Sequence, residues 1–226
     1  ENEKMQLARQ KTEYEKQLAE IKLKALLAQM NPHFIFNCMN SIQAMILSDQ
    51  NMQASTYLTK LSRLVRSVLE NSVKTFIPLQ EVIDNLKLYL ELESLRFDQQ
   101  FNYDILVENV DTYSVEMPSM LLHPYVENSI WHGLLKKEGE KNIHLHFYIK
   151  DNHLICEMTD NGIGREKAAQ LNLKKQHKSL GTIITQEMFD TLHKIKETNY
   201  GVEIIDLYDE NHFPTGTKVV VKMELS

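Results

Sequence analysis

The chain has 226 residues, 42% of them hydrophobic, which is enough for one large or two modest domains with a real core. Its 31 acidic and 25 basic residues give a formal charge of −6, and no separate basic block occurs, so a sequence-independent nucleic-acid binder is disfavoured. Because the chain opens on a charged helical stretch and contains no run of about 18 apolar residues, we expect neither a signal peptide nor a membrane span in it.

The first third of the sequence predicts long helices. From residue 1 to about 72 the pattern is helical, with one internal proline, Pro32. Between residues 7 and 28, mostly apolar positions step by four and three, which is the spacing of a coiled-coil seam. A second helix is predicted from about Pro78 to residue 97. Since two helices cannot each bury an apolar face alone, we expect two chains to pair into a four-helix bundle, a homodimer.

After about residue 100 the sequence changes to short strands. Five stretches carry the strand pattern: FNYDILVEN, IHLHFYIK, HLICEMTD, GVEIIDLYD and GTKVVVKMEL. Helices are expected near residues 117–137 and 182–197, with a tight turn at 151–153. The predicted fold class is therefore α+β, a coiled coil and helical hairpin followed by an α/β sandwich. Cys38 and Cys156 lie far apart in apolar surroundings, which predicts buried thiols rather than metal ligands.

The stretch TDNGIG follows the third predicted strand. Asn-Gly by itself favours a hairpin turn, but the next residues, REKAAQLNLKK, are typical of a helix or loop rather than of a strand. Gly162 and Gly164 would let the backbone approach a ligand closely. Asp160, at the strand end, offers an anionic acceptor for an amino group such as that of adenine.

The helix expected within LLHPYVENSIWHGLLKK has two faces. One face is an apolar stripe that recurs every four residues: Leu122, Val126, Ile130 and Leu134. Asn128, His132 and Lys136 repeat at the same spacing on roughly the opposite face. These three side chains could hold a metal-bound polyphosphate, with the Asn oxygen as a hard Mg²⁺ ligand. A plain solvated face is the alternative for this helix taken alone.

The third constellation is LLAQMNPHFIFNCMNSI, where Pro32 loosens a helix next to His33. A histidine satisfied in a core or interface is one interpretation. The other is a nucleophile, because an imidazole with a pKa of about 6.5 is mostly neutral near pH 7 and could accept a phosphoryl group. Asn37, one turn on, shares the polar stripe with His33.

Together these stretches resemble the sensor histidine kinases of the LytS/YehU type, whose phosphoacceptor box is close to the segment Gln29 to Asn37 here. The segments MPSMLLHPYVENSIWHGL, DNGIG and PTGTKVVVKMEL are also similar to this family, over about residues 25–226. The resemblance implies the Bergerat-type ATP-binding fold, with His33 as phosphoacceptor and ATP and Mg²⁺ as cofactors. It also implies the following sites: Asn128 for Mg²⁺; Asp160 for the adenine amino group; Gly162, Gly164, Gly181, Gly216 and Thr217 for the nucleotide loops.

The resemblance implies three segments: a signalling coiled coil at 1–24, a dimerisation and phosphotransfer hairpin at 25–99, and a catalytic ATP-binding domain at 100–226. His132 and Lys136 would assist at the phosphates. Phe34 follows His33 where many histidine kinases have an acid, so Asn37 is assigned to orient the ring and Glu91 or Glu93 to act as base.

The expected function is phosphorylation of His33 from Mg-ATP and transfer of the phosphoryl group to an aspartate of a response regulator. We expect the chain to be the cytoplasmic part of a bacterial inner-membrane sensor, with no direct nucleic-acid partner. The second glycine element holds one glycine, Gly181, and no Asn, which favours an alternative, a nucleotide-binding scaffold with weak or no catalysis. A coiled-coil interaction protein that binds no nucleotide is a third hypothesis.

Overall fold

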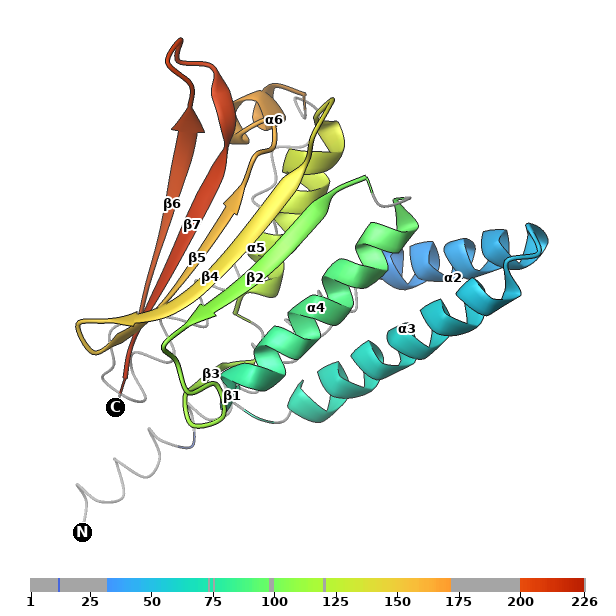
Figure 1. Ribbon diagram of the computed structural model, residues 1–226, viewed down its shortest axis with the longest axis horizontal. Coiled ribbons are helices and arrows are strands. Elements are labelled where there is room, and N and C mark those ends of the chain that lie inside the picture. The colour runs from blue at the N-terminus through green and yellow to red at the C-terminus, as the bar shows by residue number, and fades with distance from the viewer. Residues whose placement is uncertain are drawn as a thin grey trace.

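The computed structural model describes residues 12, 32–72, 74, 76–97, 100–119, 121–171 and 200–225 (Figure 1). The coiled coil expected at 1–24 lies outside the described residues except for Thr12, which is helical. The helix expected at 182–197 also lies outside them. Among the helices that the structure describes, none combines the length and the apolar character needed to cross a membrane.

A helical hairpin opens the described chain. Helix α2 (Pro32–Leu47) and helix α3 (Asn51–Ser72) are separate, so the prediction of one helix through residue 72 is wrong. Asp49 adopts the left-handed region with φ of 58°, while the amides of Asp49 and Gln50 donate to the carbonyls of Ile46 and Met45. These bonds form a Schellman ending. The run Ser-Asp-Gln-Asn supplies the cause, because short polar side chains compete with helix and Asp tolerates positive φ.

Helix α4 (Leu79–Arg96) confirms the helix predicted from Pro78. It follows strand β1 (Phe76–Pro78), which pairs antiparallel with β3 (Glu116–Pro118). Helix α4 lies between the α2–α3 hairpin and the edge strand β2 (Figure 1). This position explains why its apolar residues are buried on more than one side, among them Leu79, Ile83, Leu86 and Leu90.

The sheet contains all five strands that the sequence predicts. They are β2 (Asn102–Glu108), β4 (Asn142–Lys150), β5 (His153–Asp160), β6 (Tyr200–Tyr208) and β7 (Pro214–Glu224). Their order is β2-β4-β5-β7-β6; β2 and β4 are parallel, and the other pairs are antiparallel. The turn between β4 and β5 is confirmed, because Asp151 and Asn152 both have positive φ, as a two-residue hairpin of type I′ requires.

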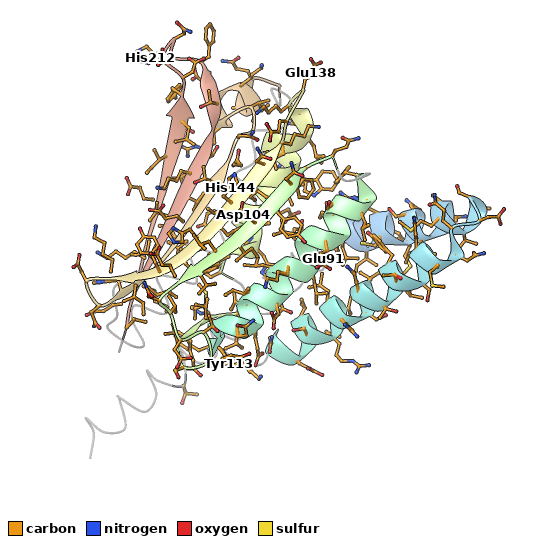
Figure 2. All side chains as sticks on the ribbon, in the orientation of Figure 1. Glu91, Asp104, Tyr113, Glu138, His144 and His212 are labelled. Carbon is orange, nitrogen blue, oxygen red and sulfur yellow. The ribbon has the colours of Figure 1, made fainter. Side chains whose placement is uncertain are left out.

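One face of the sheet is apolar and covered by helices, and the other is polar. The covered face carries Ile143, Leu145, Phe147, Leu154, Cys156, Met158, Val219 and Val221. The polar face carries ion pairs between neighbouring strands, such as Asp104 with His144 (Figure 2). This alternation is the strand pattern that the sequence predicts.

The covering layer consists of short helices. They are α5 (His123–Asn128), the π-helix η1 (Ser129–Gly133), the 3-10 helix η2 (Leu134–Lys136) and α6 (Arg165–Leu171). The helix expected near 117–137 therefore starts later, at His123, because residues 116–118 extend to pair as β3. The predicted stripe of Leu122, Val126, Ile130 and Leu134 is buried, with at most 2% of each residue exposed.

Candidate functional site

A buried carboxylate lies at the end of β5. Asp160 is 2% exposed, and the Ser129 hydroxyl donates to its Oδ2 at 2.8 Å while the Gly162 amide donates to its Oδ1 at 2.9 Å. The Thr217 backbone amide is a third donor. Burial raises the pKa of Asp160, and these hydrogen bonds oppose the rise. A carboxylate has about four acceptor sites, and the described residues fill three of those of Asp160.

Glycines pack closely around Asp160. A Cβ atom on Gly162 would lie 2.6 Å from the Cα of Gly133, and one on Gly133 would lie 3.1 Å from Asp160 Oδ1. Gly216 has a φ of 150°, and a Cβ atom on it would lie 1.9 Å from the backbone carbonyl oxygen of Asp160. Gly164, with φ of 75°, would meet the Pro214 ring at 2.7 Å. The backbone thus packs closely around the carboxylate, and a side chain at Gly162, Gly164 or Gly216 would displace its neighbours. The group formed by Asp160, Ser129, Gly133, Gly162 and Gly216 is called the pocket below.

Sequence reasoning missed two members of this pocket, Ser129 and Gly133. Both lie on the helical segment that carries Asn128, and a spacing of four residues would place them on a common side of an α-helix. The sequence prediction used only the polar stripe that starts at Asn128. Gly181, which the resemblance implies for the nucleotide loops, lies outside the described residues.

The predicted polar face of Asn128, His132 and Lys136 is interrupted. Residues 129–133 form a π-helix, whose i→i+5 bonds accommodate an extra residue per turn, so the phase calculated for an α-helix does not carry through. Asn128 and Lys136 are half-buried, while His132 is exposed. The pKa of His132 is lowered by partial desolvation of the ring and by the Lys136 charge, which shows that these two side chains remain near each other.

The phosphoacceptor candidate lies at the start of the hairpin. The backbone of His33 is in the first turn of α2, and its side chain lies outside the described part of the structure. Asn37, one turn further, is half-buried, and its backbone carbonyl accepts a hydrogen bond from the Ser41 hydroxyl at 3.0 Å.

Both acids proposed as a base on α4 are ion-paired. Glu91 accepts from Lys60 Nζ at 2.5 Å, and Figure 2 shows its place on α4. Glu93 is fully buried and accepts from Arg96 at 2.7 Å; burial raises the pKa of Glu93 to about 7. The Arg96 guanidinium also stacks on the Phe97 and Trp131 rings, at 4.2 and 4.4 Å from their centroids. The assignment of Glu91 or Glu93 as a base stays a prediction.

A second buried polar group lies where the hairpin meets α5. His123 is 7% exposed, and within the described residues neither of its ring nitrogens has a hydrogen-bond partner. Burial lowers the pKa of His123 to about 4, so the ring is neutral near pH 7. Elsewhere in the described ranges, no group of three or more His, Cys, Asp or Glu side chains is placed to hold a metal ion.

A helical hairpin with a histidine in its first turn, joined to a sheet domain with an acid-and-glycine pocket, defines the class of a histidine kinase core. A family model described as histidine kinase matches residues 21–101. The sensor protein LytS of Oceanobacillus iheyensis is 34% identical over 154 residues, covering 67% of this chain and 26% of the relative. The LytS protein of Bacillus anthracis is 30% identical over 202 residues, covering 84% and 34%. The chain belongs to the histidine kinase family and, within it, to the LytS-like sensor kinases.

The chain spans 26% and 34% of the lengths of these two relatives. Among solved structures, the histidine kinase domain of a blue-light activated histidine kinase from Erythrobacter litoralis is 19% identical, with a TM-score of 0.46. That match covers 95% of this chain and 96% of the other.

Proposed function

We propose that this chain is the kinase core of a bacterial two-component sensor, which phosphorylates His33 from Mg-ATP and passes the phosphoryl group to an aspartate of a response regulator. The pocket around Asp160 is the observation that carries the proposal. It holds a buried carboxylate with one acceptor site that the described residues do not fill, enclosed by backbone at Gly133, Gly162 and Gly216. An adenine amino group is a donor of the kind that such an acceptor selects.

The residues beside this pocket fit a polyphosphate. Asn128 directly precedes Ser129, which donates to Asp160, and Asn128 would hold Mg²⁺ through its amide oxygen. Bound Mg²⁺ supplies neutralisation of phosphate charge. Lys136 would add a cation, whereas His132, whose pKa is lowered, would act at pH 7 as a neutral hydrogen-bonding group. Gly164, Gly181 and Thr217 would shape the loops around the nucleotide.

The hairpin would supply the nucleophile. A neutral imidazole carries one nitrogen with a free lone pair, and His33 at the start of α2 would use it toward the γ-phosphorus. Asn37, one turn further along α2, would orient the ring. Glu91 would need to exchange its Lys60 partner before it could act as a base.

The exposed side of the hairpin supports a homodimer. An open groove of about 500 Å³ lies along α2 and α3, lined mainly by apolar residues that include Met39, Leu58 and Leu69, each about half exposed. A second copy of the hairpin would cover this groove and complete the four-helix bundle. The proposed boundary at residue 99/100 falls between α4 and β2. The coiled coil at 1–24 would connect the core to a membrane sensor region, which places the core in the cytoplasm.

Incorporation of label from γ-labelled ATP with Mg²⁺ tests the proposal, with wild type compared with His33→Gln and Asn128→Ala. We expect acid-labile label in wild type and none in either variant, because one variant lacks the nucleophile and the other the metal ligand. His212→Asn, a change at an exposed loop position, is the matched control and should label normally. ATP binding without label in wild type would instead support the scaffold hypothesis that the single glycine of the Gly181 element raises.

A further inference from the structure

One small cavity joins the start of the hairpin to the helix of the nucleotide pocket. Its volume is about 40 Å³, and its wall includes Phe34 of α2, Tyr89 of α4, and His123 and Glu127 of α5. The Phe34 and Tyr89 rings lie 5.4 Å apart, and the Tyr89 and His123 rings 6.1 Å apart. Rings from three helices thus pack in sequence across the junction.

The neighbours of these wall residues are the two reaction candidates. His33 directly precedes Phe34, and Asn128 directly follows Glu127. Consecutive Cα atoms are about 3.8 Å apart, so His33 and Asn128 each stand one residue from the wall of the same cavity. A cavity of about 40 Å³ holds only a few water molecules at most. The first turn of α2 and the end of α5 therefore face the same cavity within one chain, with Tyr89 between them.

The contacts that hold this arrangement are extensive and buried. Phe34 is 8% exposed, Tyr89 8% and His123 7%. The same continuous core includes Tyr57 and Leu61 of α3 together with Leu86 and Leu90 of α4. To serve the His33 of another chain, the nucleotide domain would have to leave its own hairpin, which would expose these apolar side chains to water.

The connection between the hairpin and the nucleotide domain is short. Helix α3 ends at Ser72, and β1 begins at Phe76, where it pairs at once with β3 at Pro118. Helix α4 follows without a gap and packs on both α3 and α2. The α2–α3 hairpin is therefore tied to the sheet domain through β1 and α4, which pack within the same chain.

We propose that the phosphoryl acceptor of each nucleotide pocket is the His33 of the same chain, an inference that rests on the proposed function. A lone pair of the His33 ring forms the N–P bond, and the bond from the γ-phosphorus to the β,γ-bridging oxygen breaks. ADP leaves with that electron pair. The other ring nitrogen still carries its proton, so the ring is first a phosphoimidazolium cation, and release of that proton to water gives neutral phosphohistidine and balances atoms and charge.

Mixed chains test the inference through labelling. Wild-type chains are combined with a tenfold excess of a double variant, His33→Gln with Asn128→Ala, under conditions that exchange subunits. Transfer within one chain predicts unchanged label per wild-type chain. Label that falls in proportion to the share of mixed dimers would overturn the inference. In the complementary mixture of the two single variants, we expect no label, and label on the Asn128→Ala chain would also overturn it.

A crosslink tests the same inference without ATP. Cysteines are placed on the two cavity walls, as Ile35→Cys and Glu127→Cys, and joined with a short bismaleimide; the native Cys38 and Cys156 are buried, at 0% and 2% exposed. We expect a closed loop within one chain, which migrates as a monomer. A product found only between chains would overturn the inference, as would no product beyond that of the matched pair Ile35→Cys with Glu203→Cys, whose second site lies on the far edge strand β6. Loss of label in wild type alone would overturn the proposed function but would not change the crosslink.

Discussion

Two buried polar sites in the described part of the chain differ in how completely their hydrogen-bonding groups are satisfied. In the pocket at the end of β5, Asp160 receives donors from Ser129, Gly162 and Thr217. At the junction between the hairpin and the sheet domain, His123 has no hydrogen-bond partner at either ring nitrogen among the described residues, and among the same residues Glu93 and Arg96 each keep one polar atom without a partner. Two of the three donors at the first site are backbone amides, whereas the second site is built by side chains.

The site around Asp160 is suited to binding a ligand, whereas the junction is suited to movement. A carboxylate fixed by backbone amides and close-packed glycines needs no rearrangement before a ligand donor arrives. A buried polar atom without a partner costs free energy, so these polar atoms reduce the net stability that the apolar contacts of the junction supply. The proposed function needs both properties, because the core would bind one nucleotide firmly while its hairpin would respond to a signal and then meet a response regulator.

The largest effect is expected from Gly216→Ala in the pocket. The new Cβ would lie 1.9 Å from the Asp160 carbonyl oxygen at a φ of 150°, so the backbone must move. We expect a loss of about 4 kcal/mol in the free energy of unfolding, measured by urea denaturation. The matched control is Gly201→Ala in β6, where nothing lies within 4 Å of a new Cβ. Equal effects at the two positions would show that the pocket is not closely packed.

At the junction, His123→Leu should change how stability depends on pH. The pKa of His123 is about 6.5 unfolded and about 4 folded, so its neutral form is favoured by folding. The contribution of the neutral His123 ring to the free energy of unfolding is complete above pH 6.5. It is lost as the pH falls toward 4. Wild type should therefore lose about 3 kcal/mol relative to the variant over this interval, measured by denaturant unfolding at several pH values.

The variant must be compared with wild type because Glu93 also makes stability depend on pH. It does so over an overlapping pH range, and its effect has the opposite sign. Its pKa is raised from 4.5 to about 7, so its contribution favours folding at low pH and is lost as the pH rises to 7. Both proteins contain Glu93, and the difference between them isolates His123. Parallel curves for wild type and His123→Leu would mean that His123 is not desolvated in the folded protein.

A smaller effect is expected from Asp160→Asn, which tests the pocket as an acceptor. The amide would turn one acceptor oxygen into a donor facing either Ser129 or the Gly162 amide. Loss of a hydrogen bond to a charged group weakens ATP binding by about 2 kcal/mol, or roughly 30-fold, measured by calorimetric titration. Ser129→Ala, which keeps the carboxylate, should weaken it less. If both variants bind ATP as tightly as wild type, adenine recognition lies elsewhere.

The strands and the pocket acid could be predicted from the sequence because their signals are local. The alternation of apolar and polar residues predicts the two faces of β4 and β5. The Asn-Gly pair after the strand predicts that β5 ends at Asp160. The break between α2 and α3 was also local but was overlooked, since Asp49 ends the helix through a backbone motif rather than a glycine or proline. The π-helix after Asn128 was not predicted, because the apolar stripe that recurs every four residues indicates an ordinary α-helix there.

The junction could not be predicted for a different reason. His123 was passed over because a histidine in an apolar helix gives the same pattern whether or not its ring finds a partner. Its surroundings come from Phe34, 89 residues earlier in the chain, and from Tyr89 on a third helix. Such contacts depend on how the hairpin packs on the sheet domain, which no local periodicity encodes.

The smallest effect is expected from Tyr57→Phe, which removes the hydrogen bond from the buried Tyr57 hydroxyl to Cys38 Sγ at 3.3 Å. The bond joins α3 to α2, and sulfur is a weak acceptor, so we expect a loss of about 1 kcal/mol in the free energy of unfolding. Tyr113→Phe, at a tyrosine that is 76% exposed, should change stability little (Figure 2). A loss as large as that of Gly216→Ala would show that the hairpin is as rigidly built as the pocket, and the contrast between binding and movement would no longer hold.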